Sequence, residues 1–147
     1  MVNIPRRIFV VEDELPLLEI IVRYCQKAGF ETLSARTVDE AIGLFQELET
    51  VDLRPAMPDA VWLDHFLPEK NGDEFVKFLR ASSTFSDVPI FLVTNAVEGE
   101  ITNWYLRAGI RQVYSKTMYT PSKIIADIDL YLQRSPTAPP VPPQPAA

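Results

Sequence analysis

Short β-rich segments alternate with longer helical patterns five times along this chain, and this alternation restricts the fold more than any other feature. In each helical stretch apolar residues recur every three or four positions, as in an amphipathic helix. Five strand-then-helix repeats predict an α/β fold in which helices cover both faces of a parallel sheet. The predicted strands are Ile8 to Val11, Glu31 to Ser34, Ala60 to Leu63, Ile90 to Val93 and Gln112 to Ser115.

The predicted strands differ in pattern, which indicates their places in the sheet. IFVV, AVWL and IFLV are continuously apolar, as strands buried on both faces require, whereas ETLS alternates and suits an edge. Helix boundaries carry local signals as well. Pro16 lies near the start of the first predicted helix, Gly29 ends it, Thr37-x-x-Glu40 has capping-box spacing, and Thr120-Pro121 begins the last helix.

The size and composition of the chain exclude several classes of protein. A chain of 147 residues suits one domain. Its 20 Asp and Glu exceed its 14 Lys and Arg, which argues against broad electrostatic binding to nucleic acid or to an anionic membrane. Cys25 is the single cysteine, so no intrachain disulfide is possible. With no membrane-length apolar run or signal peptide recognised, we expect a cytoplasmic protein.

The C-terminal segment has a composition of its own. Six of the 13 prolines fall within it, and it carries no charged side chain. We therefore expect the folded domain over residues 1–134 and a proline-rich disordered tail or linker over residues 135–147. An alternative is that the segment is a ligand for an aromatic-lined groove, because Pro136, Pro139, Pro142 and Pro145 repeat at PxxP spacing.

Polar side chains collect where the predicted strands end. In a doubly wound sheet, ligands bind at the carboxyl ends of the strands, so these residues are candidates for a site. They are Glu12 and Asp13 after the first strand, Asp64 and His65 after the third, Thr94 and Asn95 after the fourth, and Ser115 and Lys116 after the fifth.

These residue types suit phosphoryl chemistry. Three converging carboxylates, from Glu12, Asp13 and Asp64, repel one another unless a hard divalent cation binds them, and Mg²⁺ fits best because it needs few protein ligands. An aspartate can also attack phosphorus as a covalent nucleophile. The charge on a transferred phosphoryl group then needs a cation and a hydroxyl donor, which Lys116 and Thr94 supply.

Four motifs stand in order at these strand ends: IFVVEDE, DAVWLDHFLPEKNGDEF, PIFLVTNA and AGIRQVYSK. With them the sequence resembles, from Arg7 to about Arg134, the response-regulator receiver domain, the phospho-accepting module of two-component signalling. The resemblance implies an α/β fold: a doubly wound, flavodoxin-like sheet of five parallel strands in the order 2-1-3-4-5, with helices on both faces.

The resemblance also implies roles for individual residues. Asp64 would accept the phosphoryl group, Thr94 would bind one of its oxygens, and Lys116 would pair with Asp64 and with the phosphate. The Mg²⁺ ligands that it implies are Glu12, Asp13, Asp64 and the backbone carbonyl of Phe66.

A receiver of this kind would take phosphate from a histidine kinase or a histidine phosphotransfer protein and then switch its binding to a downstream protein. It would assist its own Mg²⁺-dependent phosphorylation and dephosphorylation without being a turnover enzyme. The partner face would be formed by the fourth helix, the fifth strand and the fifth helix. We expect no direct contact with nucleic acid or membrane, and a homodimer is possible. The chain is either a stand-alone receiver or the receiver part of a longer protein.

Four positions near the expected site differ from the family pattern or have no assigned role. Val113 stands where the family usually has an aromatic residue, and Tyr114 should point to the other side of the sheet because side chains alternate along a strand. Asn95 stands where a small residue is typical. For His65 we expect a surface loop side chain in preference to a role in proton transfer.

Two alternatives belong to other function classes. One is a receiver-fold binding module that works without phosphate. Two residues leave it open: the unusual Val113, and Thr117, which stands where the family usually has a proline. The other is a phosphatase with Asp64 as nucleophile. Such an enzyme commonly has a second acid two residues later, where this chain has Phe66.

Overall fold

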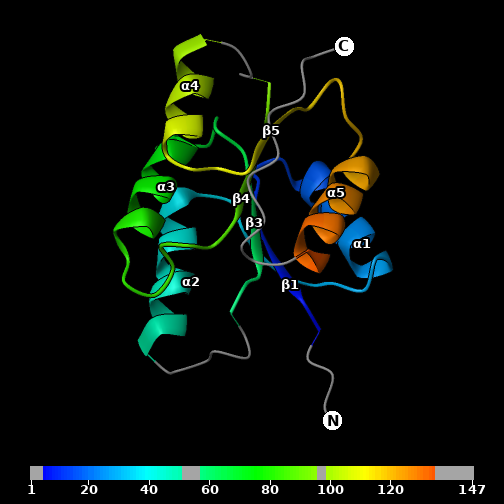
Figure 1. The fold of residues 1–147 in the computed structure, drawn as a ribbon, viewed down its shortest axis with the longest axis horizontal. Helices are drawn as coiled ribbons and strands as arrows, with labels where there is room; N and C mark the ends of the chain where they lie inside the picture. The colour runs from blue at the N-terminus through cyan, green and yellow to red at the C-terminus, as the bar shows by residue number, and fades with distance from the viewer. Residues whose placement is uncertain (1–4, 51–56, 96–98, 135–147) are drawn as a thin grey trace.

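The computed structural model describes residues 5–50, 57–95 and 99–134. Its strands form one parallel sheet in the order β2-β1-β3-β4-β5, which confirms the predicted doubly wound fold (Figure 1). The proline-rich segment lies outside the described residues, so the division at residue 134 stays a prediction. The strands are β1 (Arg7–Val11), β2 (Glu31–Ala35), β3 (Ala60–Leu63), β4 (Ile90–Thr94) and β5 (Gln112–Ser115).

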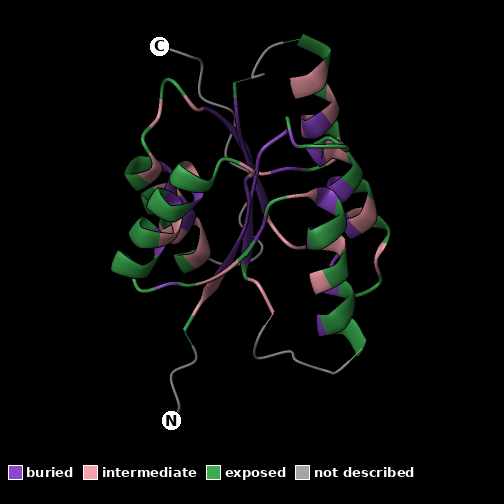
Figure 2. Cartoon of the chain, turned by 180° about the vertical axis from the view of Figure 1, so that it is seen from behind, coloured by how far each residue is buried: buried purple, intermediate pink, exposed green. Residues whose placement is uncertain are grey.

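Helices cover both faces of the sheet. Helices α1 (Leu15–Lys27) and α5 (Pro121–Gln133) lie on one face, and α2 (Val38–Thr50), α3 (Gly72–Ala81) and α4 (Gly99–Arg107) lie on the other (Figure 1). Figure 2 shows the buried residues concentrated in the sheet and on the helix faces turned toward it. The molecule is therefore a three-layer sandwich with an apolar core on each side of the sheet.

Alternation along the strands supplies both cores. In β1, Phe9 and Val11 pack in the core beneath α2, α3 and α4, whereas Ile8 and Val10 pack in the core beneath α1 and α5. All residues of β3 and β4 are buried, whereas β2 at the sheet edge is largely accessible. The expected difference between central strands and an edge strand is confirmed.

The local helix signals act as predicted. The Oγ1 atom of Thr37 accepts a hydrogen bond from the backbone N–H of Glu40 (3.1 Å), and Thr120 caps α5 by accepting from Lys123 N–H (3.2 Å). After α1, Gly29 adopts a φ of 90°, a conformation that glycine reaches without steric cost. These signals fix the starts of α2 and α5 and the end of α1.

The parallel strands bring their carboxyl ends to one edge of the sheet, and the register aligns those ends. Val11 of β1 is paired with Leu63 of β3. The pairing continues one residue further, because Asp64 N–H donates to Val11 O (3.1 Å) and Lys116 N–H donates to Thr94 O (3.2 Å). The residues that follow the strands therefore lie side by side.

Candidate functional site

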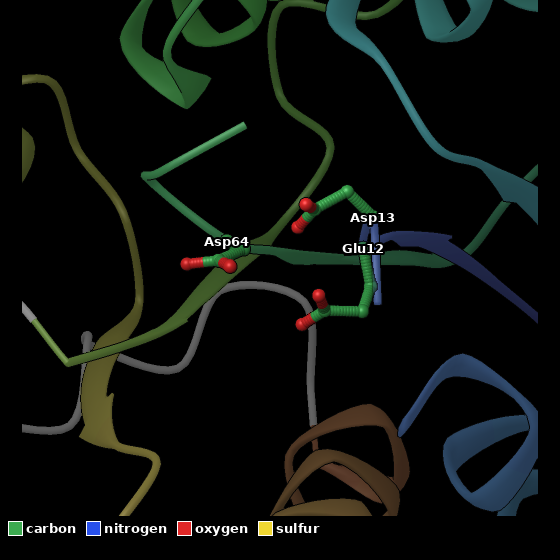
Figure 3. Close-up of side chains that lie close together, drawn as sticks. All are labelled: Glu12, Asp13 and Asp64. Atoms are coloured by element: carbon green, nitrogen blue, oxygen red, sulfur yellow. The ribbon is translucent and has the colours of Figure 1, made fainter. Parts of the chain in front are cut away.

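Three carboxylates meet at this edge of the sheet. One oxygen from each of Glu12, Asp13 and Asp64 lies within 4.8 Å of the other two. Figure 3 shows Glu12 and Asp13, at the end of β1, directing their carboxylates toward Asp64 at the end of β3. Glu12 and Asp64 are buried and Asp13 is half-buried. The acidic cluster predicted from the strand ends is therefore present.

Lys116 balances part of this negative charge. Its Nζ atom lies 2.8 Å from Glu12 Oε1 and donates a hydrogen bond to Asp64 Oδ2, also at 2.8 Å. Burial alone would lower the pKa of Lys116, but its interactions with Asp64 and Glu12 outweigh burial and hold the pKa above its ordinary value. Lys116 is therefore a permanent cation between the two buried acids at neutral pH.

The balance at Glu12 differs from that at Lys116. Burial raises the pKa of Glu12, and the ion pair with Lys116 together with a hydrogen bond from Glu14 N–H to Oε2 (3.0 Å) only partly opposes this. Oε1 has no well-aligned hydrogen bond within the described part of the chain. A buried carboxylate oxygen in this state can still accept a further positive charge.

The donor set fits a small divalent cation. Carboxylate oxygens are hard ligands, and three acids against one lysine leave an excess of negative charge. Asp13 is not used as a helix cap, since Glu14 occupies the N-cap position of α1. Its carboxylate belongs to the cluster with Glu12 and Asp64.

The remaining predicted residues lie around this cluster. Thr94 is fully buried at the end of β4, and Asn95 next to it is exposed. Phe66 is 54% exposed. Its ring packs edge to face against the His65 ring, with the ring centroids 4.8 Å apart. The metal role of the Phe66 carbonyl stays a prediction.

Val113 and Tyr114 point to opposite faces of the sheet, as predicted. Val113 belongs to the core beneath α2, α3 and α4, whereas Tyr114 belongs to the core beneath α1 and α5. The Tyr114 hydroxyl donates to Asp127 Oδ2 on α5 (3.0 Å). No aromatic ring therefore stands at position 113 on the α4 side of β5.

His65 corrects a prediction. We expected a surface side chain, but His65 is only 6% exposed and its Nδ1 atom lies 2.7 Å from the hydroxyl oxygen of Tyr105 in α4. Burial lowers the pKa of His65, against the opposing charges of Asp73 and Asp64. The physical reason for burial is that Tyr105 is fully enclosed and its hydroxyl needs a polar partner. That pairing spans 40 residues and leaves no local signal in the sequence.

Gly72, the first residue of α3, packs against the end of β3 next to the site. Its N–H donates to His65 O (2.7 Å), which folds the loop after β3 back beneath the site. A Cβ atom at this position would lie 2.4 Å from the backbone oxygen of Asp64. Only glycine therefore permits this approach of α3 to the residue at the centre of the cluster.

Comparisons with known proteins agree with this geometry. The family model described as the response regulator receiver domain matches residues 8–129. The chain is 31% identical over 129 residues to the phosphate regulon transcriptional regulatory protein PhoB of Escherichia coli, covering 88% of this chain and 52% of PhoB. It thus spans about half the length of that relative. It is 26% identical to the polar-differentiation response regulator DivK of Brucella anthropi, covering 87% of this chain and 97% of DivK.

Solved structures show the same fold. The chemotaxis response regulator CheY4 of Vibrio cholerae superposes with a TM-score of 0.73 at 22% identity, over 87% of this chain and 98% of CheY4. A CheY-like receiver domain protein from Methanospirillum hungatei gives a TM-score of 0.74 at 20% identity, over 87% and 94% of the two chains. Among the described helices of this chain, none has the length and apolar character needed to cross a bilayer.

Proposed function

The chain belongs to the response regulator receiver domain family, and from this premise we propose that it accepts a phosphoryl group on Asp64 and uses the acyl phosphate to switch partner binding. One observation carries the assignment of the residue. Asp64 is a buried carboxylate that sits in the acidic cluster and is hydrogen bonded to Lys116 at 2.8 Å. A nucleophile and a matched cation therefore stand together at the ligand-binding edge of the sheet.

The transfer step follows from these two residues. A carboxylate oxygen of Asp64 attacks the phosphorus atom of a phosphohistidine, a P–O bond forms, and the P–N bond breaks with its electron pair going to the leaving imidazole. Lys116 stays protonated and pairs with the new phosphoryl oxygens. We propose that the hydroxyl of Thr94 donates to one of them. The phosphohistidine would belong to a histidine kinase or a histidine phosphotransfer protein in the cytoplasm.

We propose Mg²⁺ as the cation of the acidic cluster, held by Glu12, Asp13, Asp64 and the carbonyl of Phe66. When bound, it would neutralise charge on the phosphoryl oxygens. The buried Oε1 of Glu12, which lacks a well-aligned hydrogen bond, supports this assignment. With these groups the domain would assist its own phosphorylation and dephosphorylation without turning over a separate substrate.

A switch must carry the change at Asp64 to another surface. His65 is the next residue in the chain, and its imidazole contacts the Tyr105 hydroxyl on α4 at 2.7 Å. Since Val113 has no ring that could swing, we propose that this contact links the site to α4. The output face would be the one formed by α4, β5 and α5, where a change in α4 alters affinity for a downstream protein.

The experiment is intact-mass spectrometry of the chain after incubation with acetyl phosphate and Mg²⁺. We expect one phosphoryl adduct in the parent, little without Mg²⁺, and none in Asp64→Asn. Asp73→Asn is the matched control, because Asp73 is a nearby acid on α3 outside the cluster, and it should retain the adduct.

Three results would contradict the proposal. An undiminished adduct in Asp64→Asn would place the chemistry elsewhere. No adduct in the parent under any condition would favour a binding module that works without phosphate. Rapid hydrolysis of phosphate esters would favour a phosphatase.

A further inference from the structure

A groove of about 260 Å³ lies between β5 and α5, on the side of the sheet that α5 covers. Figure 1 shows these two elements next to each other. In the strand order, β5 is the edge strand opposite to β2. None of the residues that line the groove belongs to the acidic cluster. It is therefore a second, separate concavity that the proposed phosphoryl transfer does not use.

Aromatic rings line this groove in two pairs. Tyr114 and Tyr119 meet edge to face with ring centroids 5.2 Å apart, and Phe91 and Tyr131 do the same at 5.7 Å. The first ring of each pair is buried and the second is half-buried, so each pair forms part of the floor and part of a wall. Leu130 adds an exposed apolar side chain to the lining.

Three of the charged side chains that line the groove have partners within it: Asp127, Lys123 and Arg111. Asp127 accepts hydrogen bonds from the Tyr114 hydroxyl (3.0 Å) and from Lys123 Nζ (2.9 Å). The guanidinium of Arg111 lies over the Tyr131 ring, 5.2 Å from its centroid. A groove with aromatic walls, one internally paired acid and several N–H donors suits a ligand that is rich in apolar rings and carbonyl oxygens. Polyproline has these properties.

The chain itself supplies such a ligand. We propose that residues 135–147 bind as a polyproline helix in the groove between β5 and α5 of the same molecule. The segment has six prolines and no charged side chain, and it begins directly after Arg134, which lines the groove. Because no linker intervenes, the effective concentration of the segment at the groove is in the millimolar range or above.

The length of the segment suits the length of α5, along which it would bind. The thirteen residues would span about 40 Å as a polyproline helix, whereas the thirteen residues of α5 span about 20 Å. The segment can therefore run back along the whole of α5. Pro136, Pro139, Pro142 and Pro145 share one face of such a helix at intervals of about 9 Å. Along the sheet the two ring pairs are separated by about 7 Å, because Phe91 pairs with Gln112, two residues before Tyr114, and this separation is close to one of those intervals.

The bound segment would cover part of the α5 and β5 surface. This consequence rests on the proposed function, in which the same surface belongs to the output face, and there the segment would compete with a downstream protein. The docking itself does not depend on phosphorylation. It can therefore fail or succeed independently of the assignment of Asp64.

The test is paramagnetic relaxation in the full chain. A nitroxide is attached at Val141→Cys, seven residues after Arg134 and so about 22 Å along an extended segment, level with the start of α5. The buried Cys25 stays unlabelled, because burial raises the pKa of its thiol to about 12. We expect at least twofold loss of signal at the backbone amides of Tyr119 and Lys123, with α2 on the opposite face as the internal reference.

Two double variants in the labelled chain test the face of the segment. Pro139→Ser/Pro142→Ser should abolish the loss of signal, whereas Pro140→Ser/Pro143→Ser, which removes the same number of prolines from another face, should retain most of it. Equal effects of the two variants would contradict the assigned face. Both variants lie outside the described fold, so they leave its core unchanged.

The remaining outcomes are decisive as well. Equal loss at α2 and at the groove would overturn the docking. Mixing nitroxide-labelled chain without ¹⁵N with ¹⁵N chain without nitroxide tests for a second copy. Strong loss at Tyr119 in that mixture would show that the groove takes the segment of another molecule, and the intramolecular proposal would be wrong.

Discussion

Lys116 is the residue on which the electrostatics of the site depend. It lies 2.8 Å from a fully buried glutamate and 2.8 Å from Asp64, whose side chain is 5% exposed, and is itself 15% exposed. Without the lysine ammonium, Glu12 and Asp64 would be two neighbouring buried carboxylates with no cation between them. The same residue supports the fold before phosphorylation and would stabilise the phosphoryl group afterwards.

The variant Lys116→Met tests both roles. In the absence of Mg²⁺ we expect the free energy of unfolding to fall by about 2 kcal/mol, less than the roughly 3–5 kcal/mol of a fully enclosed pair because Lys116 is partly exposed. We also expect formation of the adduct with acetyl phosphate to slow by about 100-fold. Urea unfolding and timed mass spectrometry measure the two effects.

Lys70→Met is the control for this variant, because Lys70 forms a 2.7 Å ion pair with Asp39 on the exposed surface. The variant Lys70→Met should change neither the free energy of unfolding nor the rate of adduct formation beyond experimental error. Equal losses of stability and of adduct formation in the two lysine variants would contradict the role assigned to Lys116.

Cys25 shows how burial sets the reactivity of a single group. The side chain is fully buried on α1, and burial raises the pKa of the thiol to about 12. We expect its labelling by a disulfide reagent at pH 8 to be at least 100-fold slower in the native chain than in urea. Labelling at similar rates in both conditions would contradict the burial of Cys25.

At the scale of elements, the start of α3 lies very close to the end of β3. Gly72 opens α3, and a Cβ atom there would meet the Asp64 carbonyl oxygen at 2.4 Å and the Tyr105 hydroxyl at 3.1 Å. Backbone cannot yield as a flexible side chain can. We expect Gly72→Ala to lower the free energy of unfolding by about 1–3 kcal/mol.

Gly43→Ala provides a control with the opposite sign. Gly43 lies within α2, and a Cβ atom there meets nothing within 4 Å. Alanine should stabilise the helix by up to about 1 kcal/mol. Thermal unfolding of both variants measures the difference, and the account of Gly72 is wrong if both substitutions stabilise the protein.

Arg80 holds two loops together at the far end of the sheet. Its guanidinium donates to the backbone oxygens of Ser86 (2.9 Å) and Val88 (3.1 Å) before β4, and of Ala108 (3.0 Å) and Gly109 (3.3 Å) before β5. A planar fork with several donors can serve these acceptors at once, and an ammonium cannot. One side chain of α3 thus fixes the entry points of two neighbouring strands.

The variant Arg80→Lys keeps the positive charge but loses the planar set of guanidinium N–H donors. We expect the free energy of unfolding to fall by about 2 kcal/mol, because several carbonyls lose a donor. Arg107→Lys, at an exposed position of α4, should have little effect. Urea unfolding measures the stability of both variants. Similar stability would show that the hydrogen bonds of the Arg80 guanidinium contribute nothing to folding.

At the scale of the whole molecule, local patterns were sufficient to predict the strands, the helices and the layered α/β architecture. The continuous apolar runs, the alternating edge strand and the helix signals at Thr37 and Thr120 each depend on neighbouring residues, and each is confirmed. The convergence of Glu12, Asp13 and Asp64 was predictable because parallel strands end at one edge. The strand order and the roles of the site residues came from the resemblance to a family.

Two contacts next to the site could not be predicted. The burial of His65 depends on the Tyr105 hydroxyl, and the need for Gly72 depends on the approach of α3 to Asp64. Neither partner is close in sequence, so no periodicity or spacing reports the contact. Both contacts lie next to the candidate site.

The most direct test of the central claim is to locate the phosphoryl group after transfer from a phosphohistidine protein. Borohydride reduces an acyl phosphate to an alcohol, which leaves homoserine where a phosphorylated aspartate stood, and peptide mass spectrometry reads its position. The account predicts a single homoserine at position 64, absent without the donor. Modification at Asp13 or Glu12, or a phosphoryl group retained on His65, would contradict it.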